Sequence, residues 1–218
     1  MDLGAAIRST GAVRAFRDEA VDDATLHAVL DDARFAPSGG NRQGWRVVVV
    51  KDTALRRCLG ELMQPVWDDY CAIGATGVTP FAADGAPQPD VTAVRVPNQL
   101  IDTIADIPVV LVVGADLSQL AMMDGDLARA PITGGASIYP FCWNLILAAR
   151  SRGLGGVITT FLARAEDEAA QSLGLPAHHG IAAVIFLGRP VHQPTKLRRA
   201  PVESFTTIDR FDGETFHG

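Results

Sequence analysis

The chain has 218 residues, a length that fits one domain with an excursion better than two full domains. Apolar residues make up 48% of the sequence, enough to bury a sizeable core, so a mainly disordered chain is excluded. Charged residues make up 20% and the net charge is −6 without a block of Lys or Arg, which argues against a nucleic-acid-binding protein and favours a buried subunit interface.

The first predicted element is a helix that begins after Asp22. The pair Asp22–Asp23 supplies an N-cap and a favourable charge at the positive end of the helix. Its apolar positions recur at helical spacing and form one face: Leu26, Val29, Leu30 and Ala33. The run Pro37-Ser38-Gly39-Gly40 ends this helix, and the β-branched stretch 45–50 predicts a buried strand.

A second helix is predicted from about Thr53 to Met63, with Thr53 as its cap. Residues 64–107 are then the least regular part of the chain and are rich in proline: Pro65, Pro80, Pro87, Pro89 and Pro97. A connection of this length is usually functional or mobile, so we interpret it as an excursion that covers a site. Its large aromatic side chains would line a pocket for aromatic ligands or, taken singly, fill a small satellite core: Trp67, Tyr70 and Phe81.

Strands alternate with helices in the second half of the chain. Residues 109–113 and 156–161 predict strands, and residues 134–152 predict a helix that is apolar on nearly every face. Such a helix is buried in a core or in an interface. A helix that starts at Glu166 and ends at Gly174 precedes a last strand at 181–187 and a polar tail at 190–218. The element order predicts an α+β or three-layer α/β/α domain.

Membrane, secreted and metal-binding proteins are not expected. The longest apolar runs are about eight residues, whereas a membrane-spanning helix needs about twenty. The N-terminus lacks the apolar core of a signal peptide, so the cytoplasm is the expected location. The three cysteines are widely spaced and are interpreted as reduced thiols: Cys58, Cys71 and Cys142.

Three segments carry candidate binding residues. Arg8, Arg14 and Arg17 precede the first capped helix and suit a phosphate, although a solvated basic patch explains any one of them. Residues 36–45, APSGGNRQGW, would let backbone amides approach a ligand, or form an ordinary helix-to-strand turn. Basic side chains follow the last strand and alone would make a charged surface loop: Lys196, Arg198 and Arg199. No nucleophile–base pattern stands out, so we assign no catalytic side chain and expect a cofactor to carry the chemistry.

The order of these motifs resembles the nitroreductase family of FMN-dependent oxidoreductases. AVRAF at 12–16 precedes the first helix, and APSGGNRQGW leads into the first strand. The later blocks then follow in order: GASIYPFCWNLILAARSRGLGG, LGLP, IFLGRP and the R-x-P-x-E pattern from Arg199 to Glu203. The resemblance covers nearly the whole chain except about 64–107, where the family itself varies.

The resemblance implies a single domain over residues 1–218, with a central mixed, largely antiparallel sheet between helices and with 64–107 as a variable excursion over the flavin. It also implies a homodimer with two FMN molecules at the interface. Arg14 and Arg199 would hold the FMN phosphate, assisted by Lys196 or Arg198. Residues of the other subunit would face the flavin: Pro37, Ser38, Gly39 and Asn41. One strand of the chain would run along the ring, with a backbone N–H or a threonine hydroxyl near N5: Ile158, Thr159, Thr160 and Phe161.

Two positions depart from the family pattern. Gly11 and Ala12 stand where relatives carry a cation, so one phosphate ligand is missing. Ala12 is still expected to belong to the cofactor-binding stretch. Arg8 would replace that cation, or the phosphate would be held less tightly. Trp143 stands where Gln is frequent, which puts a contact with the partner subunit in doubt.

The function implied is hydride transfer from NAD(P)H through FMN to an electron-poor small molecule, such as a nitroaromatic or a quinone. Two alternatives remain open. One is an enzyme of the same fold that fragments its own flavin or dehalogenates aromatic substrates. The other is an FMN-binding dimer without turnover.

Overall fold

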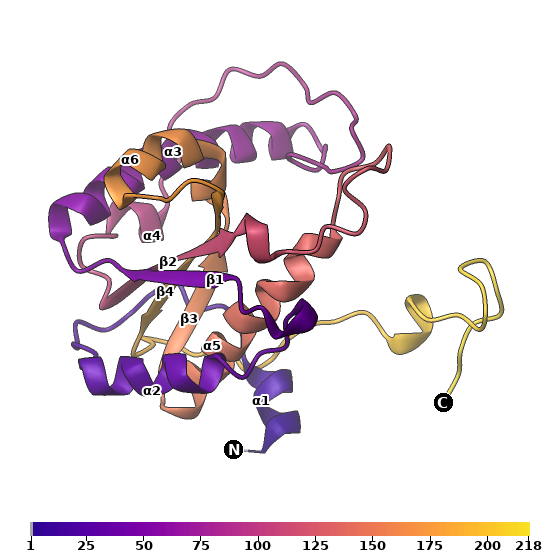
Figure 1. Ribbon diagram of the computed structural model, residues 1–218, viewed down its shortest axis with the longest axis horizontal. Helices are drawn as coiled ribbons and strands as arrows, with labels where there is room; N and C mark the ends of the chain where they lie inside the picture. The colour runs from indigo at the N-terminus through magenta and orange to yellow at the C-terminus, as the bar shows by residue number, and fades with distance from the viewer. Residues whose placement is uncertain (1) are drawn as a thin grey trace.

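Four strands form one antiparallel sheet at the centre of the computed structural model, which describes residues 2–218 (Figure 1). The strands are β1 (Trp45–Val49), β2 (Val109–Asp116), β3 (Gly155–Thr159) and β4 (His179–Gly188). They lie in the order β1-β2-β4-β3, so β1 and β3 are the two edges. All three pairings are antiparallel. The largely antiparallel sheet is thus confirmed, and residues 2–218 contain no parallel pair between these strands.

Helices cover both faces of the sheet and make the predicted three layers (Figure 1). On one face, α2 (Asp23–Ala33) and α5 (Tyr139–Ser151) pack over Leu111 and its same-face neighbours. On the other face, α3 (Thr53–Ala75), α4 (Gln99–Asp102) and α6 (Glu166–Leu173) pack over Val110 and Val112. Because side chains alternate along β2, one apolar strand supplies both cores.

Helix α3 is twice as long as the sequence predicts. It continues through Pro65 to Ala75, because residues beyond the proline pack against the body: Ile73 is buried and Trp67 packs edge-on against Phe161. Proline removes one backbone donor, but the packed face keeps the helix intact. The N-cap is Asp52, which accepts from the Leu55 N–H at 2.6 Å, and not Thr53. The excursion is therefore irregular only after residue 75.

The predicted helix over 134–152 is also corrected. A 3₁₀ turn, Thr133–Ser137, precedes α5, and the helix buries one face while Tyr139 and Trp143 stay exposed. Another helix, α1 (Leu3–Ser9), was not predicted because none of its residues is buried. Within residues 2–218, no helix combines the length and apolar character needed to cross a membrane.

The C-terminal tail leaves the body of the molecule and runs out into solvent (Figure 1). It carries a short 3₁₀ turn at Val202–Ser204 and an isolated bridge between Thr207 and Thr215. Its apolar side chains are exposed: Val202, Phe205, Ile208, Phe211 and Phe216. The sequence predicts a polar tail, whereas the structure shows that the tail also exposes several aromatic side chains.

Candidate functional site

A cavity of about 660 Å³ opens beside edge strand β3. Four segments enclose it. The end of β3 and the following turn form one wall, α3 contributes Trp67 and Tyr70, and the stretch before α4 forms a third wall. Arg14 comes from the N-terminal segment that covers the sheet edge. The remaining lining residues are Pro97, Asn98, Gln99, Leu100, Val157, Ile158, Thr159, Thr160 and Phe161.

The cavity brings together seven residues that sequence analysis singled out: Arg14, Ile158, Thr159, Thr160, Phe161, Trp67 and Tyr70. Phe81 does not line it. The Phe81 ring instead packs behind Tyr70, with ring centroids 6.5 Å apart. Residues 97–100 belong to the excursion that was expected to cover the site, but sequence analysis did not single them out. Pro97-Asn98 before apolar Leu100 has the pattern of a capped helix start.

Strand β3 presents free backbone groups to the cavity. The N–H of Val13 donates to the carbonyl of Gly156 at 2.9 Å, so Gly156 points away from β4. Backbone groups alternate sides along an antiparallel strand, and Ile158 therefore also points away from β4. Its N–H and carbonyl lie on the outer side of the sheet, where a ligand can reach them.

Two polar atoms in the cavity walls have no hydrogen-bond partner within the described residues. They are the indole nitrogen of Trp67 and the hydroxyl of Thr159. Buried polar groups in native proteins are nearly always satisfied. Both atoms are buried beneath the cavity surface, so a ligand reaches them only if the side chains of the walls adjust.

Arg14 lies between this cavity and a second one of about 310 Å³, and Gln99 also lines both. Among residues 2–218, no hydrogen bond or ion pair engages the Arg14 guanidinium, whose side chain is exposed. An unpaired guanidinium at the junction of two cavities is suited to an anionic ligand group.

Gly11 stands where the resemblance predicts a cation, and its surroundings are tightly packed. Its N–H donates to the carbonyl of Pro194 at 3.2 Å, and a Cβ at Gly11 would stand 2.8 Å from the Pro194 Cβ and 2.9 Å from Leu197 Cδ2. No side chain fits there, so the departure at Gly11 is a packing requirement of this chain.

The same contact lays segment 193–197 beside the N-terminal stretch. Lys196, Arg198, Arg199 and Arg8 remain exposed and do not line the cavity.

The loop at residues 36–44 lies far from the cavity within one chain. It precedes β1, at the opposite sheet edge from β3. The Ser38 hydroxyl accepts from the Gln43 N–H at 3.0 Å, and the Gly39 N–H donates to the Ser137 hydroxyl at 3.1 Å. Asn41 has a positive φ of 53°, which Asn tolerates better than most residues. The role of Pro37, Ser38, Gly39 and Asn41 in a partner's site stays a prediction.

Metal and thiol chemistry find no support in residues 2–218. No group of three or more His, Cys, Asp or Glu side chains is placed to hold a metal ion there. Burial raises the pKa of the Cys142 thiol to about 11, so this cysteine stays protonated and inert at neutral pH.

A larger cavity of about 780 Å³ lies between residues 117–135 and the start of α5. Its lining is almost wholly apolar and holds no charged side chain. It lacks the cation and the unsatisfied polar groups of the β3 cavity, and the sequence-predicted residues do not line it. The β3 cavity is therefore the candidate site.

The sequence profile of the nitroreductase family matches residues 7–189, which include every element that builds this cavity. The chain belongs to the nitroreductase family. This confirms the resemblance seen in the sequence motifs and makes the protein an oxidoreductase by family.

Curated relatives of this nitroreductase-family protein are named for different reactions. An NADH dehydrogenase of Thermus thermophilus is 28% identical over 213 residues, 93% of this chain and 94% of the relative. A 5,6-dimethylbenzimidazole synthase of Rhodospirillum rubrum is 30% identical over 178 residues, 82% of this chain and 77% of the relative. The family is therefore clear, while the reaction differs among its members.

Solved structures share the fold. The NADPH:FMN oxidoreductase of Vibrio harveyi, complexed with NAD+, has a TM-score of 0.67 at 20% identity, covering 94% of this chain and 76% of that one. A nitroreductase-like protein of Bacillus cereus has a TM-score of 0.67 at 20% identity, covering 96% of this chain and 97% of that one. These likenesses confirm the α+β architecture.

Proposed function

We propose that this protein is an FMN-dependent oxidoreductase that takes hydride from NAD(P)H and reduces an electron-poor small molecule such as a nitroaromatic or a quinone. The observation that carries the proposal is the cavity beside β3, which combines an open strand edge, an unpaired arginine and aromatic walls. The names of relatives, an NADH dehydrogenase and an NADPH:FMN oxidoreductase, support the same chemistry.

The residues of the cavity suit FMN. FMN has a flat ring with a polar edge and an anionic phosphate. The outward backbone groups of Ile158 suit the polar edge, and Arg14 suits the phosphate. The cavity volume of about 660 Å³ lies within the usual range of about 300–1,000 Å³ for small-molecule sites.

Bound flavin would supply the two-electron transfer, so the side chains need not act as acids or bases. The chain's part is to bind and to orient. Backbone donors along β3 would stabilise negative charge on the edge of a bound flavin, because they are fixed in position before the reaction starts. Trp67 and Tyr70 form a flat apolar wall that holds planar donors and acceptors and limits water.

A homodimer completes this proposal. The exposed face of α5, with Tyr139 and Trp143, and the aromatic side chains of the tail are apolar surfaces that one chain leaves open. A partner would cover them and bring its own loop 36–44 toward the cavity. We expect light scattering to give a mass of about twice 23.1 kDa at micromolar protein. A 23.1 kDa species at all concentrations would remove the two-subunit site.

Fragmentation of flavin is the second candidate function. One relative is named as a 5,6-dimethylbenzimidazole synthase, and the dimethylated benzene ring in that product's name is also part of flavin. The discriminating measurement is flavin recovery after aerobic turnover. Intact FMN supports the NAD(P)H oxidoreductase, whereas consumption of FMN supports fragmentation.

The primary experiment adds FMN to the purified protein and records its absorption while NADH or NADPH is mixed in a stopped-flow instrument. Bands near 370 and 450 nm that bleach on mixing support the proposal (approximate positions for oxidised flavin). Tight FMN binding without bleaching by either donor would indicate the remaining alternative, an FMN-binding dimer without turnover. Failure to bind FMN overturns the proposed function.

A further inference from the structure

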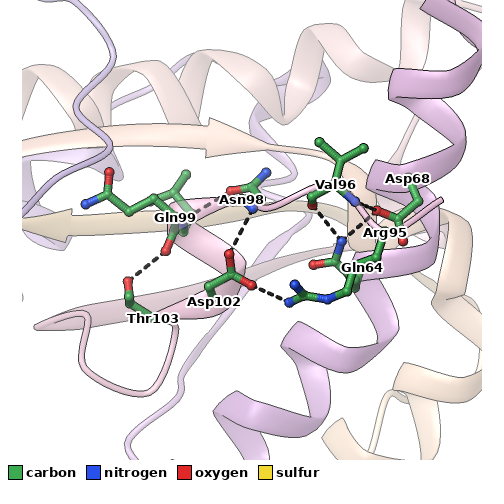
Figure 2. A network of polar contacts seen from close by, with 9 residues as sticks. Gln64, Asp68, Arg95, Val96, Asn98, Gln99, Asp102 and Thr103 are labelled. Carbon is green, nitrogen blue, oxygen red and sulfur yellow. Dashed lines mark hydrogen bonds and ion pairs between the residues drawn. The ribbon is translucent and has the colours of Figure 1, made fainter.

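Residues 95–100, the last four of which line the cavity, are tied to helix α3 by a polar network (Figure 2). Asp68 is its centre on the helix side. One carboxylate oxygen of Asp68 accepts from the Val96 N–H at 2.7 Å and from the Gln64 side-chain amide at 2.7 Å. The same Gln64 amide donates to the Val96 carbonyl at 3.0 Å. Both backbone groups of Val96 are thus bonded to side chains of α3.

The other end of this wall is fixed by α4. Asp102 accepts from the Asn98 N–H at 3.0 Å and pairs with the Arg95 guanidinium at 2.5 Å (Figure 2). The Asn98 side chain in turn caps α4 by accepting from the Leu100 N–H at 3.1 Å. Pro97, between the two anchors, has a fixed φ. The stretch 95–100, which we call the strap, is therefore held at both ends.

Residues 97–100 of the strap line the cavity, whereas the anchoring side chains do not: Gln64, Asp68, Arg95 and Asp102. Trp67 lines the cavity, and Asp68 follows it directly on α3. The same helix turn therefore supplies one wall of the cavity and, through Asp68, anchors the strap that forms the neighbouring wall. Residues 76–94, which precede the strap, have no such double anchoring to α3. The excursion thus contains a fixed part beside the site and a long loop beyond it.

We propose that Asp68 is a positioning residue that sets the width of the ligand slot by clamping the strap to α3. This inference rests on the proposed function, because the ligand expected in the slot is FMN. Asp68 does not line the cavity and acts through the backbone of Val96. Charge strengthens its two hydrogen bonds, since bonds to an ionised acceptor are about twice as strong as neutral ones.

The test compares Asp68→Ala and Asp68→Asn with a matched control, Asp69→Ala. Asp69 is the next residue on the same helix, is exposed and makes no hydrogen bond or ion pair among residues 2–218. We expect the dissociation constant for FMN to rise about tenfold in Asp68→Ala, less in Asp68→Asn, and not at all in Asp69→Ala. The rise should come from faster FMN release, measured by dilution and return of free-flavin fluorescence.

The unfolding temperature of the FMN-free proteins separates positioning from a general structural role. If Asp68→Ala melts earlier without FMN but binds FMN as tightly as the wild type, the clamp is structural only and the proposal is wrong. A positioning role requires that Asp68→Asn, which keeps a hydrogen-bond acceptor, binds FMN more tightly than Asp68→Ala. Wild-type protein that fails to bind FMN defeats the proposed function, whereas equal binding by all four proteins defeats only the clamp.

Discussion

The guanidinium carbon of Arg164 lies 4.1 Å from the centre of the Phe81 ring. This contact joins the irregular loop after α3 to the 3₁₀ turn Phe161–Ala165, whose first residue lines the cavity. Phe81 also contacts Tyr70, and Tyr70 packs edge-on against Phe161, with ring centroids 5.8 Å apart. An aromatic cluster thus runs from the loop to the cavity wall, with the cation–π contact at its outer end.

Acceptor choice should depend on this aromatic cluster. We expect Trp67→Ala, Tyr70→Ala and Phe81→Ala each to change the ratio of kcat/KM values for a nitroaromatic and a quinone acceptor. Trp67 and Tyr70 should have the larger effects, because they line the cavity and Phe81 acts through Tyr70. Reduction of the flavin by NAD(P)H should change less. Variants that keep the wild-type ratio and only lose thermal stability would show that these rings fill a satellite core.

Arg14→Ala should weaken FMN binding without unfolding the protein. A charge-assisted Arg–phosphate interaction contributes about 1.5–3 kcal/mol, or about ten- to a hundredfold in affinity. Fluorescence titration with FMN and with riboflavin, which lacks the phosphate, locates the contact. Loss of FMN affinity with unchanged riboflavin affinity places Arg14 on the phosphate. Equal loss for both ligands would place it on the ring, and no loss for either would contradict the assignment.

Gly11 should not tolerate the cation that related sequences carry. Gly11→Ala places a Cβ within 2.9 Å of Pro194 and Leu197 and should destabilise the fold by about 1–3 kcal/mol, as overpacking usually does. Ala12→Arg adds a cation at the next, exposed position and should leave the denaturant midpoint unchanged. Equal midpoints for Gly11→Ala and the wild type would show that the 193–197 segment moves aside easily.

The loop at residues 122–133 should respond to acid through Asp124. Hydrogen bonds from the Thr133 hydroxyl and the Ile132 N–H, with the Arg129 guanidinium beside them, hold the pKa of Asp124 well below its ordinary value of 3.8. A lowered folded-state pKa means that stability is full above pH 3.8 and is lost as pH falls further. Asp124→Asn should therefore melt below the wild type at pH 7, with a gap that narrows under pH 3.8 in thermal scans. A constant gap would show that the charge of Asp124 is not what stabilises the loop.

The sequence predicts the helices and strands of the body well where burial is periodic. The burial of β2, a continuous apolar run, and the apolar face of α2 follow directly from residue order, and the structure confirms both. The extension of α3 past Pro65 is not predictable from local rules, because packing of Trp67 and Ile73 outweighs the missing backbone donor.

The sequence predicts some residues of the candidate site and not others, because some of them come together only through contacts between distant segments. Motif residues such as Arg14 and Thr159 were found because the resemblance assigns them, and the structure places both in one cavity. The anchoring of the strap to α3 was not predicted because it joins residues 28 positions apart in the chain, as in the bond between Val96 and Asp68. Gly11 was interpreted as a lost ligand, whereas its close contact with Pro194 is visible only in three dimensions.

The outer side of β3 has a consequence for handling the protein. A strand edge with free N–H and carbonyl groups is a template for pairing with another chain, and proteins normally cover such edges. Here Val13 covers Gly156, while the proposed function assigns the stretch around Ile158 to the flavin. Loss of the cofactor would therefore expose an unpaired strand edge. The FMN-free protein should then aggregate faster than the FMN-bound protein in turbidity measurements at equal concentration. Flavin would then serve this chain as a solubility factor as well as a redox group.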